Sequence, residues 1–163
     1  MANVSIDNYV SKTISDICKN LNGDDLNHCA HFVSHALGIQ FGYTCSVQSG
    51  KNLSVSANIR VQELFAKCPA VAVWDDASVK DKTVLVFVTK KGNLVDLKTK
   101  TFGNIPKKHV GVLWNGNVYH YSNSAEQVMK QTPDDFFSRM TSAYGPLQKY
   151  YGTLPAEAGN QLV

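Results

Sequence analysis

The chain has 163 residues, of which 44% are hydrophobic and 18% are charged, and its formal net charge is +3. These values are typical of one globular domain, so we expect a single domain spanning residues 1–163. The lysines and arginines are scattered, which favours a solvated surface over a nucleic-acid interface. No apolar run approaches the ~20 residues of a membrane span.

Two amphipathic segments open the chain and predict helices. Apolar residues at helical spacing run from Ile6 to Leu21, and Asn22-Gly23 ends that segment. A second helix starts at or near Cys29 and stops at Gly38. Three residues could cap its first turn: Asp24, Asp25 and Asn27.

Downstream, a loop and a third helix precede a change to extended structure. Residues 39–54 predict a loop, and residues 56–67 a helix with four inward residues: Ile59, Leu64, Phe65 and Cys68. Runs rich in β-branched and aromatic residues then predict strands at Ala70–Trp74, Thr83–Thr89, Asn93–Leu97, Lys108–Trp114 and Asn117–Ser122. Helices followed by antiparallel strands are typical of an α+β domain.

The end of the chain predicts one more helix and an irregular tail. Thr132 can cap that helix, with Pro133 at its first position. Its apolar side chains, Phe136, Phe137 and Met140, can pack on the body of the domain. We expect irregular structure from about residue 145, where glycine and proline interrupt the chain.

Cys29 is the candidate nucleophile because it begins the apolar stripe of the second helix. Unpaired backbone N–H groups and the dipole at a helix start favour negative charge, so we expect a lowered thiol pKa there. A buried core thiol is the alternative interpretation. A nucleophilic cysteine also needs a base and a group that orients that base.

The Asn115-Gly116 turn supplies both groups through the register of its hairpin. Asn-Gly between alternating runs predicts a two-residue type I′ turn, in which Trp114 faces Asn117. Counting outward gives further pairs on one face of the sheet: Leu113 with Val118, Gly111 with His120, and His109 with Ser122. We therefore expect the His109 and His120 rings to meet, and the Cys29 helix to dock on that same face.

At these positions the chain resembles NlpC-like cell-wall cysteine peptidases. Cys29-Ala30-His31-Phe32-Val33 is similar to their Asp-Cys-Ser-Gly-Phe/Leu-Val signature, and His109-Val110-Gly111-Val112-Leu113 to their His-Val-Gly-Ile-Tyr strand. His120 falls at the place of their third polar residue, and the resemblance runs from about Asp24 to Ser122. The chain departs from the family at His28, where an acid is usual, at His31, where a small residue is usual, and in lacking a Gly-Asp-Leu stretch.

The resemblance implies a papain-like fold, with N-terminal helices packed on a central antiparallel sheet of about five strands. It implies cleavage of an amide bond in peptidoglycan stem peptides, without a cofactor. By the same resemblance Cys29 is the nucleophile, His109 the general base and His120 the residue that orients the base. Three residues are candidates for substrate binding: His28, Trp74 and Asp75.

Other interpretations of these residues remain open. His31 and His35 could bind zinc from one helix face, but a third ligand at helical spacing is missing, so we predict no metal site. An acyltransferase or lipid-modifying enzyme of the same superfamily would resemble a permuted order, with histidine before cysteine. A non-enzymatic binding relative is the third alternative.

The chain shows no secretory signal, so we expect synthesis in the cytoplasm. A compact domain of this kind also resembles antibacterial amidase effectors injected by type VI secretion. That resemblance implies delivery to the periplasm or outside by a non-classical route, and an immunity protein as partner.

Overall fold

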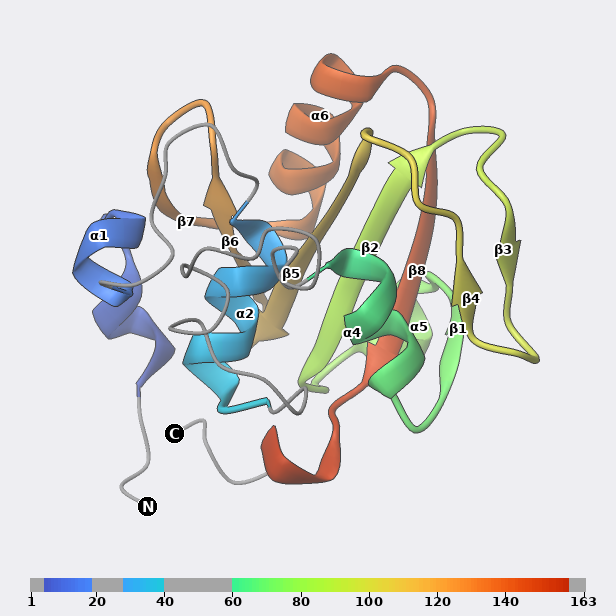
Figure 1. Ribbon diagram of the computed structural model, residues 1–163, viewed down its shortest axis with the longest axis horizontal. Coiled ribbons are helices and arrows are strands. Elements are labelled where there is room, and N and C mark those ends of the chain that lie inside the picture. Colours follow the sequence, from blue (N-terminus) through green and yellow to red (C-terminus); the bar gives the residue numbers. More distant parts are fainter. Residues whose placement is uncertain (1–4, 19–27, 40–59, 159–163) are drawn as a thin grey trace, which may run out of the picture.

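The computed structural model describes residues 5–18, 28–39 and 60–158, which form an α+β structure (Figure 1). Its main sheet has the strand order β1-β8-β2-β5-β6-β7, and every pair in it is antiparallel. The bounds of these strands are β1 Val71–Val73, β2 Val84–Lys90, β5 Lys108–Trp114, β6 Asn117–Ser122, β7 Gln127–Gln131 and β8 Leu147–Thr153. A separate ribbon pairs β3 (Val95–Asp96) with β4 (Thr101–Phe102).

The helices lie on both faces of this sheet. Their bounds are η1 Ile6–Tyr9, α1 Ile14–Ile17, α2 Cys29–Leu37, α4 Val61–Lys67, α5 Asp76–Val79, α6 Pro133–Tyr144 and η2 Ala156–Ala158. In Figure 1, α1, α2 and α4 lie on the side of the sheet nearer the viewer. On that side, α2 and α4 share one buried cluster with Leu85, Phe87, Val110 and Val112. Helix α6 belongs to a second cluster, with Val86, Val88, Leu113 and Val118.

Because side chains alternate along a strand, these two clusters are the two faces of the sheet. Helix α2 therefore packs on the face of Val110 and Val112. The expectation that it docks on Leu113 and Val118 was wrong: those residues pack against Phe136 of α6. Tyr119 and Tyr121, expected on the face away from the two histidines, are buried on the α2 side.

The first expected helix is divided in two. Ser11 has a φ of 70°, which ends η1 before α1 begins. The backbone N–H of Ser11 donates to Val128 and the carbonyl of Lys12 accepts from Val128. Pairing with β7 therefore takes this segment out of the helix and protects an edge strand of the sheet. The continuation to Leu21 lies outside the described residues.

The tail from Gly145 was wrongly predicted to be irregular, because β8 lies inside the sheet between β1 and β2. Only Gly152 of this strand is fully buried, so it lacks the apolar run that a central strand usually shows. Gly152 is required there, since an added Cβ would lie 2.4 Å from Sγ of Cys68.

Two other predicted helix ends agree with the structure. Gly38 ends α2 with a left-handed φ of 67°, and Thr132 caps α6, accepting from the N–H of Asp135. Helix α4 buries Leu64, Phe65 and Cys68 as expected, but it begins at Val61, after an extended Arg60, and not at residue 56. The N-cap position of α2 is taken by His28, so the expected cap at Asp24, Asp25 or Asn27 was wrong. The loop at 40–54 and Ile59 lie outside the described residues.

Candidate active site

Cys29 is the first residue of α2 and lies against the start of β5. Its side chain is buried, and the backbone N–H of Val110 hydrogen-bonds the sulfur. The ammonium of Lys108 is close enough to favour the thiolate electrostatically. On the other side, the backbone N–H of His28 donates to Oδ1 of Asn123, which anchors the helix start at the end of β6.

The hairpin explains why a backbone N–H is available for the sulfur. The turn pairs Trp114 with Asn117 and Leu113 with Val118, as the sequence predicts. The β5–β6 ladder, both strands of which are described, ends with the next pair, Val112 and Tyr119. The expected pairs of Gly111 with His120 and of His109 with Ser122 are therefore not part of it. In the register of this turn, Val110 would next point its N–H at β6. That N–H instead donates to the sulfur of Cys29, so the cysteine lies where β5 and β6 stop pairing.

His109 and His120 meet on the α6 face, and Gln131 extends the contact. Nε2 of His109 lies 2.9 Å from Nδ1 of His120, and Nε2 of His120 lies 2.7 Å from Oε1 of Gln131. Phe136 packs against both rings, with centroids 6.0 Å from His109 and 4.7 Å from His120. The expected contact between the two imidazoles is confirmed.

The direction of these hydrogen bonds follows from Gln131. Its amide oxygen only accepts, so Nε2 of His120 carries the proton. In a neutral His120, Nδ1 is then the acceptor, and Nε2 of His109 donates to it. A neutral His109 consequently holds its lone pair on Nδ1, which is the form a general base requires.

Both imidazoles are neutral at neutral pH. Burial lowers the pKa of His109 well below its usual value of 6.5, and the charges of His120 and Arg139 act in the same direction. Burial also lowers the pKa of His120 to about 4, although its hydrogen bond to Gln131 opposes this shift. The pair can therefore accept a proton and does not hold one in advance.

The thiol does not have the lowered pKa that the helix start predicts. Burial raises the pKa of Cys29 to about 11, which outweighs the N–H groups of Val110 and Ala30 and the charge of Lys108. The dipole argument neglects desolvation, which penalises the thiolate. Cys29 is thus a protonated thiol at neutral pH, and it could act as a nucleophile only with the help of a base.

Cys29 and His109 approach the start of β5 from opposite faces of the sheet, and Tyr144 connects the two. The Tyr144 hydroxyl donates to the carbonyl of Lys108 at 3.2 Å. Burial raises the pKa of Tyr144, and the charge of Cys29 adds to this shift, so the hydroxyl and the thiol influence each other. Tyr144 and His109 also line one pocket.

That pocket has a volume of about 420 Å³ and lies between α6 and the end of β6. Arg139 brings a cation into its wall, and its Nη2 donates to Oγ of Ser122 at 2.9 Å and of Ser124 at 3.0 Å. Asn123, which anchors the start of α2, also lines this pocket. A ligand in it would thus lie beside His109 and close to the start of α2.

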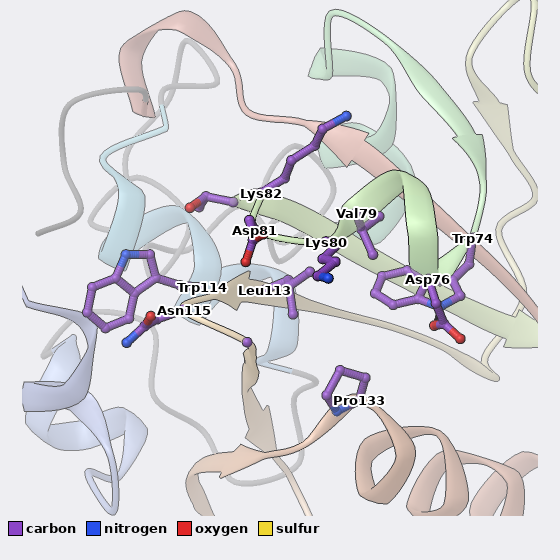
Figure 2. Close-up of a pocket in the computed structure, with 12 residues that line it drawn as sticks. Trp74, Asp76, Val79, Lys80, Asp81, Lys82, Leu113, Trp114, Asn115 and Pro133 are labelled. Atoms are coloured by element: carbon purple, nitrogen blue, oxygen red, sulfur yellow. Dashed lines mark hydrogen bonds between the residues drawn. The ribbon is translucent and has the colours of Figure 1, made fainter.

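A larger pocket, of about 760 Å³, lies at the opposite end of β5, around the Asn115-Gly116 turn (Figure 2). Trp74 lines this pocket, and its Nε1 donates to Asp76 at 2.8 Å. Asp75 caps α5 by accepting from the N–H of Ala77. Seven residues at about 3.4 Å each separate the ends of β5 by about 20 Å. Trp74 and Asp75, expected to bind substrate beside Cys29, therefore do not lie with it.

The three histidines around Cys29 form a chain along α2. His28 and His31 are buried, and their Nδ1 atoms lie 3.1 Å apart. Nε2 of His31 lies 3.1 Å from Nε2 of His35, which is exposed. His28 reaches the surroundings of the pocket through the hydrogen bond from its backbone N–H to Asn123, so it keeps its place as a candidate contact.

Sequence reasoning missed four residues beside the site: Asn123, Gln131, Arg139 and Tyr144. Gln131 belongs to β7, a strand too polar to be predicted from an apolar pattern. Its hydrogen bond to His120 therefore could not be predicted either. Tyr144 ends α6, and only its place one residue before Gly145 could have marked it as the end of a helix.

Comparisons with protein-family models, with curated proteins and with solved structures found no match to this chain. Within the described residues, none of the helices combines the length and apolar character that a membrane crossing needs.

Proposed function

We propose that this protein is a cysteine hydrolase that cleaves an amide bond in peptidoglycan stem peptides. The observation that carries the proposal is the arrangement at the start of β5. There the sulfur of Cys29 accepts a hydrogen bond from the backbone N–H of Val110. His109, the residue before Val110, hydrogen-bonds His120, which in turn hydrogen-bonds Gln131. A thiol, a neutral base and an orienting chain are the parts of an activated cysteine nucleophile.

In the proposed reaction, Sγ of Cys29 attacks the carbonyl carbon, and the thiol proton passes to Nδ1 of His109, which approaches the start of β5 from the opposite face of the sheet. The backbone N–H of Cys29 donates to the oxyanion of the tetrahedral intermediate. His109 then protonates the leaving amine, and the C–N bond breaks to leave a thioester on Cys29. Water, deprotonated by the same Nδ1, releases the acid and restores the thiol.

His120 acts through His109 and completes the proposed triad. Because Nε2 of His109 lies 2.9 Å from Nδ1 of His120 and donates to it, the His109 ring keeps Nδ1 as its basic atom throughout the cycle. When His109 is protonated, His120 accepts from the imidazolium and stabilises it. Gln131 has the corresponding role toward His120.

Arg139 supports the choice of a substrate with carboxylates. Its guanidinium has five N–H donors, and two serine hydroxyls accept from one nitrogen, Nη2. Stem peptides carry free carboxylates, which an arginine binds in a bidentate manner. Arg139→Leu should raise KM at least about tenfold with little change in kcat, and Arg139→Lys should recover part of the loss.

The order of the residues separates this proposal from the related acyltransferases. Cys29 precedes His109 in the chain, whereas histidine precedes cysteine in the permuted relatives. As part of the same proposal, the enzyme reaches the wall by a non-classical route such as type VI secretion, and an immunity protein protects the producer.

The test is digestion of purified peptidoglycan, with the released fragments identified by mass spectrometry. The unmodified protein should release amide-cleaved fragments and Cys29→Ala should release none. Cys68→Ala is the matched control, because Cys68 is also a buried thiol but donates to Leu64 on α4. Fragments released equally by Cys29→Ala, or none from the unmodified protein, would overturn the proposal.

A further inference from the structure

A second cluster of reactive side chains lies between α1 and α2, away from the thiol of Cys29. Sγ of Cys18 and one ring nitrogen each of His31 and His35 all lie within 4.8 Å of one another. Cys18 directly follows α1, whereas His31 and His35 are one turn apart on α2. The third metal ligand, which is missing at helical spacing on α2, is therefore supplied by Cys18 at the end of α1.

The distances are close to those of a tetrahedral metal site. Zinc–nitrogen bonds of about 2.0–2.1 Å and zinc–sulfur bonds of about 2.3 Å place two nitrogens about 3.3 Å apart, and sulfur about 3.6 Å from nitrogen. The Nε2 atoms of His31 and His35 lie 3.1 Å apart. The sulfur needs to approach them by about 1 Å at most, which a side-chain rotation can supply.

The donors also select a class of metal. One thiolate and two imidazoles suit zinc and similar transition metals, and they do not suit calcium or magnesium, which prefer oxygen. Cys18 and His31 are buried, while His35 is exposed and leaves a path for the ion to enter.

His28 completes the arrangement as an outer partner. Its Nδ1 lies 3.1 Å from Nδ1 of His31. With a metal on Nε2, His31 carries its proton on Nδ1 and donates it to His28, which fixes the ring as outer partners of metal-bound histidines do.

We propose that Cys18, His31 and His35 bind a zinc ion that ties α1 to α2. On binding, the Cys18 thiol releases its proton to solvent and forms the metal–sulfur bond, and both histidines bind as neutral rings. A fourth ligand, such as water, completes the tetrahedron on the exposed side. This site is independent of the hydrolase proposal, and binding is measured without any turnover.

The test uses the full chain without a histidine tag, titrated with Co²⁺ and then with Zn²⁺. Co²⁺ should bind at one equivalent and give thiolate-to-cobalt absorption in the near ultraviolet, which Zn²⁺ should abolish. Cys18→Ala should remove this absorption, and His35→Ala should weaken binding more than about 100-fold, beyond the 10–100-fold typical of an outer partner. Cys68→Ala, which removes a buried thiol elsewhere, should bind as the unmodified protein does.

Because Cys18 is buried, its variant could fail to fold, so His35→Ala carries the test independently. The exposed His35 can be replaced with little effect on the metal-free fold, which circular dichroism checks. Zn²⁺ should raise the thermal midpoint of the unmodified protein and leave that of His35→Ala unchanged. The proposal is overturned if Co²⁺ binds without thiolate absorption, if it fails to bind, or if folded His35→Ala binds equally well.

Discussion

At the scale of single residues, the candidate site depends on which nitrogen carries each proton. Gln131 accepts from His120, His120 accepts from His109, and His109 is left with a basic Nδ1. The lowered pKa values of both rings keep this chain neutral at neutral pH. In the proposed hydrolase, Gln131 is therefore a positioning residue, which would act on the reaction only through the two histidines.

Exchanging Gln131 separates this role from simple packing. Gln131→Ala frees His120 to adopt the other tautomer, so kcat should fall by part of the about 10²–10⁴-fold that a general base supplies. Gln131→Glu keeps the acceptor and adds a charge, which raises the pKa of the histidine pair. It should keep most of the activity and move the acid limb of the kcat profile to higher pH. If the two variants have identical pH profiles, Gln131 does not act through the histidines.

Sequence reasoning identifies the residues of this site better than their surroundings. The Asn-Gly turn correctly gives the contact between His109 and His120, because a two-residue turn leaves one register. The pKa of Cys29 was predicted in the wrong direction, since the local pattern shows the helix start but not the burial of the thiol. Local sequence patterns also could not bring Cys18 together with His31 and His35, because they belong to different segments of the chain.

At the scale of elements, the β5–β6 hairpin holds the histidine pair through a close approach at Gly111. A Cβ added there would lie 2.9 Å from Cγ1 of Val118, 3.0 Å from the carbonyl of Tyr119 and 3.1 Å from Cβ of His120. Contacts this short with a backbone carbonyl cannot be relieved by rotating a side chain. The lack of a side chain at Gly111 therefore allows β5 and β6 to pack this closely beside Cβ of His120.

Gly111→Ala should lower the free energy of unfolding by about 1–3 kcal/mol through overpacking, and it should lower activity by displacing His120. Urea denaturation and peptidoglycan digestion measure the two effects. Gly116→Ala is the control, because its added Cβ meets nothing within 4 Å and only its positive φ of 81° adds strain. It should cost about 1 kcal/mol and leave activity unchanged. Equal activities for the two variants would contradict this role of Gly111.

The same hairpin makes the fold sensitive to acid. The pKa of His120 is about 4 in the folded protein against 6.5 as its usual value, so the unfolded chain binds more protons between these values. Stability is therefore fully present above about pH 6.5 and is lost as the pH falls toward 4. Between about pH 7.5 and 5, His120 alone should account for about 2 kcal/mol.

Urea unfolding at these two pH values measures the loss. His120→Asn retains hydrogen-bonding capacity without titrating in this range, so its free energy of unfolding should depend less on pH. An equal dependence in the unmodified protein and the variant would show that His120 does not cause it.

At the scale of the whole molecule, the sheet lies between α2, which carries Cys29, and the pair His109 and His120. Alternation correctly grouped His109, Gly111 and Leu113 on one face, but it cannot say which helix covers which face. That choice was predicted wrongly because apolar residues line both faces of β5, and both α2 and α6 offer apolar stripes. The strand β8 was missed for a related reason: its place between β1 and β2 depends on partners far away in the chain.

Trapping the thioester shows whether Cys29 attacks an amide carbonyl with the help of His109. Peptidoglycan fragments are mixed with the protein, the reaction is quenched in acid within a turnover, and the protein is digested and analysed by mass spectrometry. We expect an acyl group on the peptide that contains Cys29, absent from Cys29→Ala and formed at least about 10²-fold more slowly in His109→Ala. Amide-cleaved fragments that accumulate without any acyl group on Cys29, or an equally fast acylation in His109→Ala, would contradict it.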